Sequence, residues 1–274
     1  MPLRSYQADF LREALESVLR QTSPRWELCI IVEQRNLGKF KKILAETLDD
    51  ERVHLVVNNG RKLAGAFNTG MSVSKTDFTS ILLADDLWAP QAVEVLENAI
   101  ERHPEADFFH SSRRFIDESG AFISSIYPSR DRVTLEDFRK GAPIKHLLCW
   151  RREMAIRIGG LDESLNSVGP DDFDFPWTMA EHGANFQPVP ECLYFYREHD
   201  ECFRLTTGLP LSVHKQEIRR ILRKHGLSEA EVATRIEAGL QGYLKQCIYK
   251  SRLDRWMDKL SSGRRKPGYR PGYK

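Results

Sequence analysis

The chain has 274 residues and nearly balanced charge, with 41 basic and 39 acidic side chains and a formal net charge of +2. This length is ample for one large domain with a buried core, or for one domain with a small appendage. The excess of positive charge is small and largely local, which argues against bulk binding of nucleic acid.

The cysteines and the apolar runs indicate the compartment. Five scattered cysteines, none of them in a Cys-x-x-Cys pair, are Cys29, Cys149, Cys192, Cys202 and Cys247. This pattern favours reduced thiols in a cytosolic protein over a disulfide framework or a zinc site. No apolar run approaches the roughly 20 residues that span a bilayer, and residues 1–10 lack the apolar core of a signal peptide. We therefore expect a soluble cytoplasmic protein.

Helical and strand-like patterns alternate through the first hundred residues. Apolar residues recur at helical spacing in segments 9–22, 39–48, 62–74 and 90–102, with Asp9 as the first N-cap. Short apolar runs typical of buried strands occupy 28–32, 53–57 and 78–84. The last of these runs has the pattern of a strand covered on both faces, as in a parallel sheet. The alternation predicts an α/β fold with a mainly parallel sheet flanked by helices.

The pattern changes after residue 102. Segments 107–117 and 121–127, around Glu118-Ser119-Gly120, predict an antiparallel hairpin. Segment 186–196 is extended but interrupted by Pro188 and Pro190, which predicts an edge strand at best. Helical patterns occupy 134–140 (with Thr134 as cap), 153–158, 171–182 and 209–260, the last broken near Gly226. Residues 263–274 carry five basic side chains and no acid.

Two acidic clusters are candidates for chemistry. Asp85 and Asp86 follow the apolar run 78–84, and ligand sites of open α/β sheets lie at the carboxyl ends of strands. An ordinary loop with a helix cap is the alternative. The second cluster, 171–174, contains three acids before a helix, where compensation of the helix dipole accounts for a few tenths of a kcal/mol. One carboxylate could hold a divalent cation against a pyrophosphate, and another could accept the proton of an attacking hydroxyl.

Other nucleotide motifs are excluded by their own requirements. Residues 60–65 fit the GxxxxG spacing, but Ala66 and Phe67 follow where a P-loop needs Lys and Ser or Thr. The chain contains no GxGxxG after a strand and no GxSxG elbow.

Four segments resemble family 2 glycosyltransferases of the GT-A fold, in the order and spacing of that family. They are FLREALESVLRQTSPRWELCIIV, NNGRKLAGAFNTGMSVSKTDFTSILLADD, GGLDESLNSVGPDDFDFPW and PVPECLYFYREHD. These segments are similar to the first helix and second strand, the helix and DxD-type motif, the acidic loop of the catalytic base, and the closing strand with its histidine. The resemblance covers roughly residues 3–200 and implies a catalytic domain at 1–205. The helical pattern and the basic composition that follow predict a helical extension at 206–262 and a disordered tail at 263–274.

The resemblance implies an inverting, metal-dependent transferase. Its donor would be a nucleotide sugar, with a UDP sugar as the first expectation, its cofactor Mn²⁺ or Mg²⁺, and its acceptor a glycan or lipid-linked hydroxyl in polysaccharide biosynthesis. Carried over, Asp85 and Asp86 contact the sugar nucleotide, with Asp86 as the direct metal ligand. Asp172 is the general base and Asp171 the acid before it. His199 matches a position that binds metal or diphosphate in relatives, although a lone histidine after a strand is more often structural.

Two further residues are assigned to the nucleotide. Lys62 lies where a basic side chain can approach it, with a solvated helix start as the alternative. Glu33 stands near the acid that usually contacts the base, but the familiar Asp-Gly-Ser is absent and base specificity is left open.

The sequence departs from the family pattern at two places. Leu83 occupies the usual first acid of the DxD motif. The chain opens at MPLRSYQ, where relatives have a buried first strand, so we expect that strand to be missing and sheet edges to be left unpaired. The departure suggests a start assigned too late, or another segment that fills the gap.

Two rival functions and one membrane hypothesis follow. A nucleotidyltransferase would need a glycine- and basic-rich loop after its first strand, which LRSYQ is not. A non-catalytic relative that binds a glycan or partner is favoured by the missing strand and Leu83, and opposed by the two intact acid pairs. The tail at 263–274 is either a solvated terminus or a peripheral contact with anionic lipid at the inner face of the membrane, on the order of 1 kcal/mol per basic residue.

Overall fold

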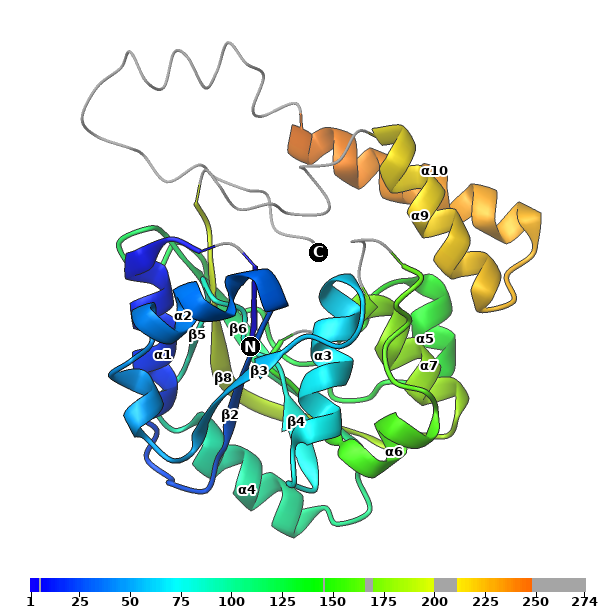
Figure 1. Ribbon diagram of the computed structural model, residues 1–274. Helices are drawn as coiled ribbons and strands as arrows, with labels where there is room; N and C mark the ends of the chain where they lie inside the picture. Colours follow the sequence, from blue (N-terminus) through cyan, green and yellow to red (C-terminus); the bar gives the residue numbers. More distant parts are fainter. Residues whose placement is uncertain (5, 145, 166–169, 200–210, 248–274) are drawn as a thin grey trace. The chain divides into compact units, whose positions relative to one another are not determined.

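The computed structural model describes residues 1–4, 6–144, 146–165, 170–199 and 211–247 (Figure 1). The chain divides into two compact units, Met1–Asp200 and Glu201–Lys274. The predicted α/β fold is confirmed for the first unit, which holds two sheets. The basic segment 263–274 and the end of the predicted helical region lie outside the described residues.

The smaller sheet is parallel and has the order β1-β2-β3. It consists of β1 (Pro2–Leu3), β2 (Leu28–Val32) and β3 (Val53–Val57), with Leu3 opposite Val32 and Leu28 opposite Val53. The sequence predicts that the first strand is missing. The structure instead contains a two-residue β1, so the edge of β2 is paired over its last two residues rather than left open.

The larger sheet is mixed and has the order β4-β7-β6-β8-β5. Its strands are β4 (Phe78–Ser80), β5 (Leu87–Trp88), β6 (Phe108–Ile116), β7 (Leu148–Arg151) and β8 (Phe186–Arg197), and only β6 and β8 are parallel. The prediction of a parallel strand over 78–84 is therefore wrong in direction and length, because β4 pairs antiparallel with β7. Ile81 and Leu82 are nevertheless buried, so the apolar run reported burial correctly but not strand pairing.

The prediction that 186–196 is at best an edge strand also needs correction. Strand β8 lies between β6 and β5 in the larger sheet. Its two prolines fall where β5 does not reach, since β5 pairs only with Tyr194 and Phe195. On the β6 side, the register shifts between Ser111 and Ser112, next to the proline segment. An unpaired side and a bulge are the places where a strand tolerates proline.

The predicted hairpin is confirmed at the end of β6. Two backbone hydrogen bonds close the turn. The Asp117 amide donates to the Ala121 carbonyl, and the Gly120 amide donates to the Asp117 carbonyl. Residues 121–127 pair with β6 through isolated bridges at Phe122 and Tyr127. Gly120 has φ 81°, a conformation that glycine adopts readily.

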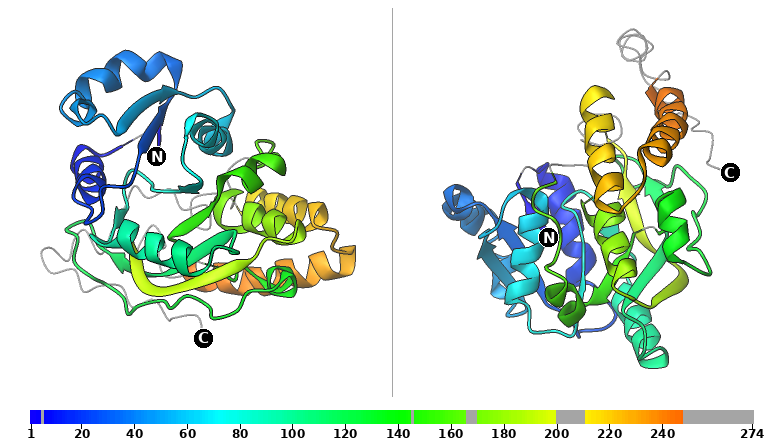
Figure 2. Two further views of the ribbon diagram at one scale, coloured as in Figure 1. Left: turned by 90° about the horizontal axis from the view of Figure 1, so that it is seen from below. Right: turned by 90° about the vertical axis from the view of Figure 1, so that its right-hand side faces the viewer.

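The helices of the first unit cover the sheets (Figure 2). They are α1 (Ala8–Leu19), α2 (Leu37–Ile43), α3 (Lys62–Val73), α4 (Ala92–Arg102), α5 (Leu135–Lys140), α6 (Arg152–Arg157) and α7 (Phe175–Glu181). Helix α1 buries Phe10, Leu11, Ala14, Leu15 and Val18, which is the stripe that its helical spacing predicts. Its N-cap is Gln7 rather than the expected Asp9. The predicted cap of α5 is confirmed, because Thr134 and Asp137 form a reciprocal capping box.

The second unit contains two amphipathic helices. Helices α9 (Leu211–Lys224) and α10 (Glu229–Cys247) are separated by Gly226 at φ 72°, where the sequence predicted a break. The Ser228 amide and hydroxyl both donate to Glu231 Oε2, at 2.8 and 2.7 Å, and fix the start of α10. No helix in the described part of the chain combines the length and apolar character needed to cross a membrane.

Candidate active site

Asp86 is buried in the turn between β4 and β5. Its side chain is 1% exposed, and both carboxylate oxygens accept hydrogen bonds. Tyr194 Oη donates to Oδ2 at 2.6 Å, and the Arg197 amide donates to Oδ1 at 2.8 Å. Burial, and next the charge of Asp85, raise the pKa of Asp86 to about 7, although the two hydrogen bonds oppose the shift.

Asp85 is the more accessible acid of the pair. Its side chain is 35% exposed, and Oδ2 lies 3.2 Å from Nε2 of His199. The His199 ring packs against Phe10 of α1, with centroids 4.9 Å apart. The sequence predicted Asp86 as the direct metal ligand, but the oxygens of Asp86 are already engaged and enclosed. The geometry leaves Asp85 as the accessible carboxylate, in contact with the buried side chain of His199.

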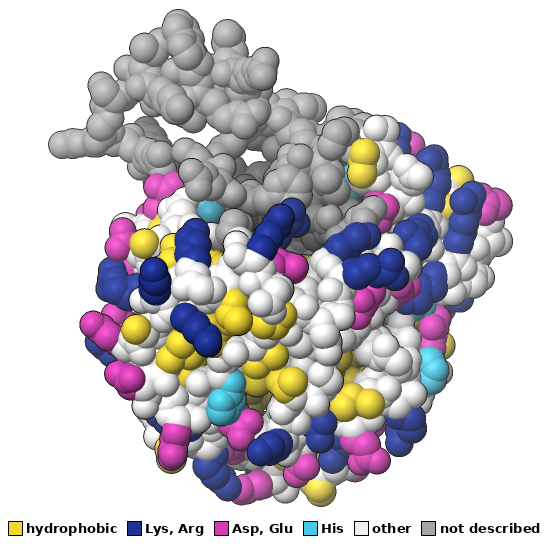
Figure 3. Space-filling view, in the orientation of Figure 1, with side chains coloured by type: hydrophobic (Ala, Val, Ile, Leu, Met, Phe, Trp, Pro, Cys, Tyr) yellow, Lys and Arg dark blue, Asp and Glu magenta, His cyan; other side chains and the backbone are white. Residues whose placement is uncertain are grey.

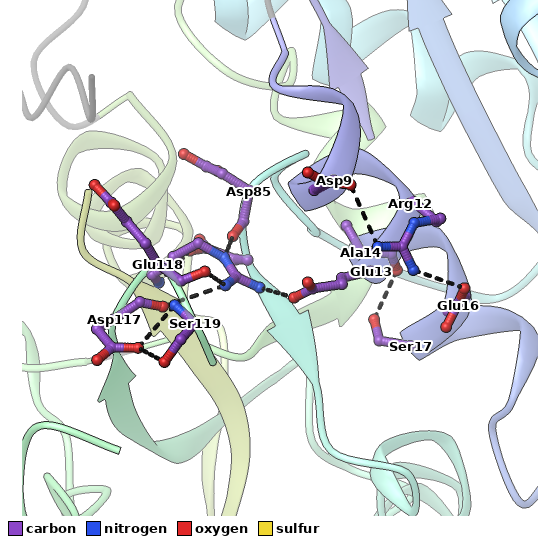
Figure 4. Close-up of polar contacts among 12 residues, drawn as sticks. Asp9, Arg12, Glu13, Ala14, Glu16, Ser17, Asp85, Asp117, Glu118 and Ser119 are labelled. Atoms are coloured by element: carbon purple, nitrogen blue, oxygen red, sulfur yellow. Dashed lines mark hydrogen bonds and ion pairs between the residues drawn. The ribbon is translucent and has the colours of Figure 1, made fainter. Parts of the chain in front are cut away.

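The Arg197 side chain holds the backbone of the Asp85–Asp86 turn through a hydrogen bond. The guanidinium is fully buried and lies 4.5 Å from the centre of the Phe10 ring. Nε donates to the Asp85 carbonyl at 2.8 Å, and Nη1 donates to the carbonyls of Asp117 and Glu118 at 3.2 Å each. Nη2 pairs with the carboxylate of Glu13 on α1. Figure 4 shows these groups from three separate segments converging on one point.

The second acidic cluster lies in a π-helical turn. Residues Pro170–Asp174 form this turn, which leads directly into α7. Such turns are rare and occur frequently at functional sites. Asp174 is the N-cap of α7 but makes no side-chain capping hydrogen bond, so simple capping does not account for it. An acid at this position still compensates the dipole of α7, so the alternative given by the sequence stands for this residue.

Asp171 and Asp172 differ in their surroundings. Asp171 is 6% exposed, and its Oδ2 lies 3.4 Å from Nε2 of His146. The carboxylate of Asp172 receives no hydrogen bond from another side chain among the residues that the structure describes. Burial first, and then the charge of Asp171, raise the pKa of Asp172, while His146 and Arg113 act in the opposite direction.

A buried path connects the two clusters. Asp86 is bonded to Tyr194, the Tyr194 ring lies against the His146 ring with centroids 5.1 Å apart, and His146 contacts Asp171. The predicted acids are therefore brought into one neighbourhood. Sequence reasoning missed Tyr194, Arg197 and His146. The first two are polar residues within the apolar strand that ends in YREHD, which is a usable signal, whereas nothing in the sequence marks His146.

The expected nucleotide residues lie at the ends of the parallel strands. Glu33 directly follows β2, and its Oε1 accepts a hydrogen bond from Asn58 Nδ2, just after β3, at 3.1 Å. Lys62 begins α3 with φ 59°, which is uncommon for a residue with a side chain. Both residues stand at the carboxyl edge of the smaller sheet, where the α/β rule places ligands.

The glycines of segment 60–65 serve packing. A Cβ at Gly65 would lie 2.5 Å from the carbonyl carbon of Gly60. The backbones approach so closely that a side chain at either position would clash with the other. Glu163 accepts hydrogen bonds from the Arg61 amide at 2.8 Å and from Asn68 Nδ2 at 3.0 Å. These contacts fasten the start of α3 to the loop before the second acidic cluster.

The described residues include no group of three or more acids, histidines or cysteines arranged to hold a metal. Asp85 and His199 supply one carboxylate oxygen and one ring nitrogen in contact. Mg²⁺ and similar hard cations are commonly held by one or two protein carboxylates together with substrate phosphates. The pair therefore fits a cation that is completed by a diphosphate. It does not fit a cation held by protein alone.

A family profile described as "Glycosyl transferase family 2" matches residues 1–156, and the chain belongs to that family. The O-antigen biosynthesis protein RfbC of Myxococcus xanthus is 26% identical over 202 residues, which are 72% of this chain and 15% of that protein. The uncharacterised glycosyltransferase MJ1057 of Methanocaldococcus jannaschii is 24% identical over 69% of this chain and 66% of its own length. An uncharacterised glycosyltransferase of Haemophilus influenzae is 25% identical over 80% of this chain and 73% of its own length. The chain thus spans a small part of RfbC and about two thirds of MJ1057.

Solved structures share the fold. The S. aureus TarS fragment 1–349 in complex with UDP-GlcNAc gives a TM-score of 0.64 at 14% identity, over 90% of this chain and 72% of that one. The mannosyltransferase PcManGT of Pyrobaculum calidifontis, in complex with GDP-Man and Mn²⁺, gives a TM-score of 0.53 at 19% identity. The match covers 95% of this chain and 77% of that one. These likenesses, with the family match, place the chain among GT-A glycosyltransferases.

Proposed function

We propose that this glycosyltransferase moves a sugar from a nucleotide sugar to a hydroxyl of a glycan or lipid-linked acceptor, with inversion at the anomeric carbon. One observation carries the proposal. A fixed turn presents the partly exposed Asp85 in contact with the buried His199, and a buried path through Tyr194 and His146 connects it to a second acidic turn. The first turn suits a diphosphate leaving group, and the second suits a base.

Asp172 is the proposed general base. Its pKa is raised by burial and by Asp171, and a raised pKa makes a carboxylate a stronger proton acceptor. The acceptor oxygen attacks the anomeric carbon from the face opposite the diphosphate, and its proton passes to Asp172. The bond from that carbon to the diphosphate breaks, and the nucleoside diphosphate departs. A single displacement of this kind inverts the configuration.

The proposed donor side centres on Asp85. Asp85 and His199 would hold Mn²⁺ or Mg²⁺, and a cation there would offset the negative charge of the departing diphosphate. We assign the direct contact to Asp85 rather than Asp86, because both oxygens of Asp86 are engaged by Tyr194 and Arg197. Asp86 then supports the turn from inside.

Glu33 and Lys62 are proposed to face the nucleotide. Their place at the carboxyl ends of the parallel strands supports this assignment. TarS was solved with UDP-GlcNAc and PcManGT with GDP-Man, so the fold accommodates either base. The likeness to RfbC, an O-antigen biosynthesis protein, supports a polysaccharide acceptor.

Calorimetric titration with UDP and GDP, each with and without Mn²⁺, tests the proposal. The proposal expects metal-dependent binding of at least one of them. Asp172→Asn should bind that nucleotide as the wild type does but lose transfer by about 10²-fold or more. Absence of any metal-dependent binding would favour a non-catalytic relative. Equal turnover of variant and wild type would remove Asp172 from the role of base.

A further inference from the structure

Arg113 is a cation beside the proposed base, and its guanidinium contains a buried N–H without a hydrogen-bond acceptor among the described residues. It lies on β6 opposite Tyr194 of β8, whose ring packs on His146 beside Asp171, and its charge is among those that act on Asp172. The unpaired N–H is that of Nε. A buried donor left unpaired costs free energy, so such a group calls for an explanation.

Aromatic rings hold the Arg113 side chain in place. The guanidinium carbon lies 5.3 Å from the centre of the Phe115 ring and 5.8 Å from that of Tyr196. Phe115 also packs edge-on against Tyr127 and Tyr196, with ring centroids 5.2 and 5.5 Å apart. The side chain is therefore positioned by contacts that satisfy none of its N–H groups.

The neighbouring Arg114 shows what a structural arginine on this strand looks like. Successive side chains of a strand point to opposite faces. Arg114 Nε donates to the Ser124 carbonyl at 2.7 Å, and its guanidinium stacks over Phe122 at 3.9 Å. Arg114 is thus bonded within the hairpin, whereas the buried Nε of Arg113 has no acceptor among the described residues.

We propose that Arg113 binds an anionic group of the acceptor, a carboxylate or a phosphate, next to the hydroxyl that Asp172 deprotonates. The inference rests on the proposed function, since it assigns the acceptor to the side of Asp172. A planar guanidinium matches both oxyanions through paired N–H donors. The acceptor class would be an acidic glycan or a phosphate-bearing one, because the hydroxyls of a neutral sugar accept hydrogen bonds but leave the charge of Arg113 without a counter-ion.

Binding to probe molecules tests this assignment without turnover. Ligand-observed NMR would follow methyl glucuronide, glycerol phosphate and neutral methyl glucoside on the full chain, in the presence of Mn²⁺ and UDP or GDP. The wild type should bind at least one anionic probe about tenfold or more tightly than methyl glucoside, as expected for a hydrogen bond to a charged group. Arg113→Gln should abolish that preference and Arg113→Lys should retain only part of it. Arg114→Gln is the matched control and should keep it in full.

The outcomes separate this inference from the proposed function. Nucleotide binding that is unchanged in Arg113→Gln, together with a lost anion preference, supports the assignment. The assignment is overturned if the wild type shows no preference for an anionic probe, or if Arg113→Gln keeps that preference. In either case, metal-dependent binding of UDP or GDP would still support the proposed function. Weakened UDP or GDP binding in Arg113→Gln would assign the guanidinium to the donor diphosphate and would also overturn it. If the wild type binds neither UDP nor GDP, the result counts against the proposed function.

Discussion

The two acidic turns of the candidate site are built in opposite ways. The Asp85–Asp86 turn is held by the buried Arg197 and by Tyr194, so its backbone and one carboxylate are fixed. The turn that carries Asp171 and Asp172 is a π-helical irregularity, in which Asp171 lies 3.4 Å from His146 and Asp172 accepts no side-chain hydrogen bond from the described residues. A leaving-group site benefits from preorganised geometry, whereas a base must keep its oxygens available to a proton. The difference between the turns agrees with the division of roles that we propose.

Figure 3 adds the electrostatic setting. On the face that it shows, basic and acidic side chains are interspersed, as a formal net charge of +2 leads one to expect. A surface of mixed sign gives no broad field to steer a charged substrate on this face, which agrees with our proposal that a single side chain, Arg113, binds the anionic group.

Replacing Arg197 should have the largest effect on stability. Arg197→Leu leaves the Glu13 carboxylate and three backbone carbonyls without their donor. Breaking a buried charge network from one side costs about 3–5 kcal/mol, which urea unfolding monitored by circular dichroism would measure. A loss below about 1 kcal/mol would show that the donor-side turn is not braced as described. Arg12→Leu, on an exposed salt bridge of α1, is the control and should change little.

The pH dependence of stability should report Asp86. Its pKa is raised to about 7 in the folded chain from the ordinary 3.8, so the folded state binds this proton more tightly than the unfolded state. The contribution is therefore fully present below about pH 4 and is lost as the pH rises through 7, with a magnitude of about 4 kcal/mol. Asp86→Asn should flatten this decline in urea titrations between pH 5 and 8. An unchanged slope would contradict the buried, protonatable state of Asp86.

Tyr194→Phe tests the bracing of the Asp85–Asp86 turn through a smaller change in unfolding free energy. The variant removes the 2.6 Å hydrogen bond to Asp86 and leaves the carboxylate with the Arg197 amide alone. We expect a loss of about 1–3 kcal/mol that is greater at pH 8 than at pH 6, because the ionised carboxylate needs the donor most. Tyr127→Phe, on the hairpin, serves as the control. A loss that is equal at both pH values would separate Tyr194 from the ionisation of Asp86.

Asp171→Asn should have the smallest effect on stability and a distinct effect on catalysis. Asp171 makes one long contact and repels Asp172, so we expect unfolding free energy to change by less than about 1 kcal/mol. Because the charge of Asp171 raises the pKa of Asp172, its removal should shift the acidic limb of the kcat/KM profile, where the base becomes protonated, to lower pH. An unshifted profile would mean that Asp172 does not govern that limb.

Much of this organisation follows from local patterns in the sequence. The helical stripe of α1, the turn at Gly120 and the capping box at Thr134 depend on neighbouring residues, and their predictions hold. The direction of β4 and the interior place of β8 do not, because an apolar run reports burial and says nothing of its partner strand. The acids of the site could be found from motifs, whereas their division of roles depends on Tyr194 and Arg197, which lie over a hundred residues away along the chain.

The central claim is that Asp85 serves the donor and Asp172 the acceptor. The most direct measurement is the Mn²⁺-dependent affinity for UDP or GDP of Asp85→Asn and Asp172→Asn, by calorimetry beside the wild type. The account predicts that Asp85→Asn loses the metal-dependent part of binding, by tenfold or more, on the order of 1.4 kcal/mol, and that Asp172→Asn keeps it. Retained metal-dependent binding in Asp85→Asn, or its loss in Asp172→Asn, would contradict the division of the site.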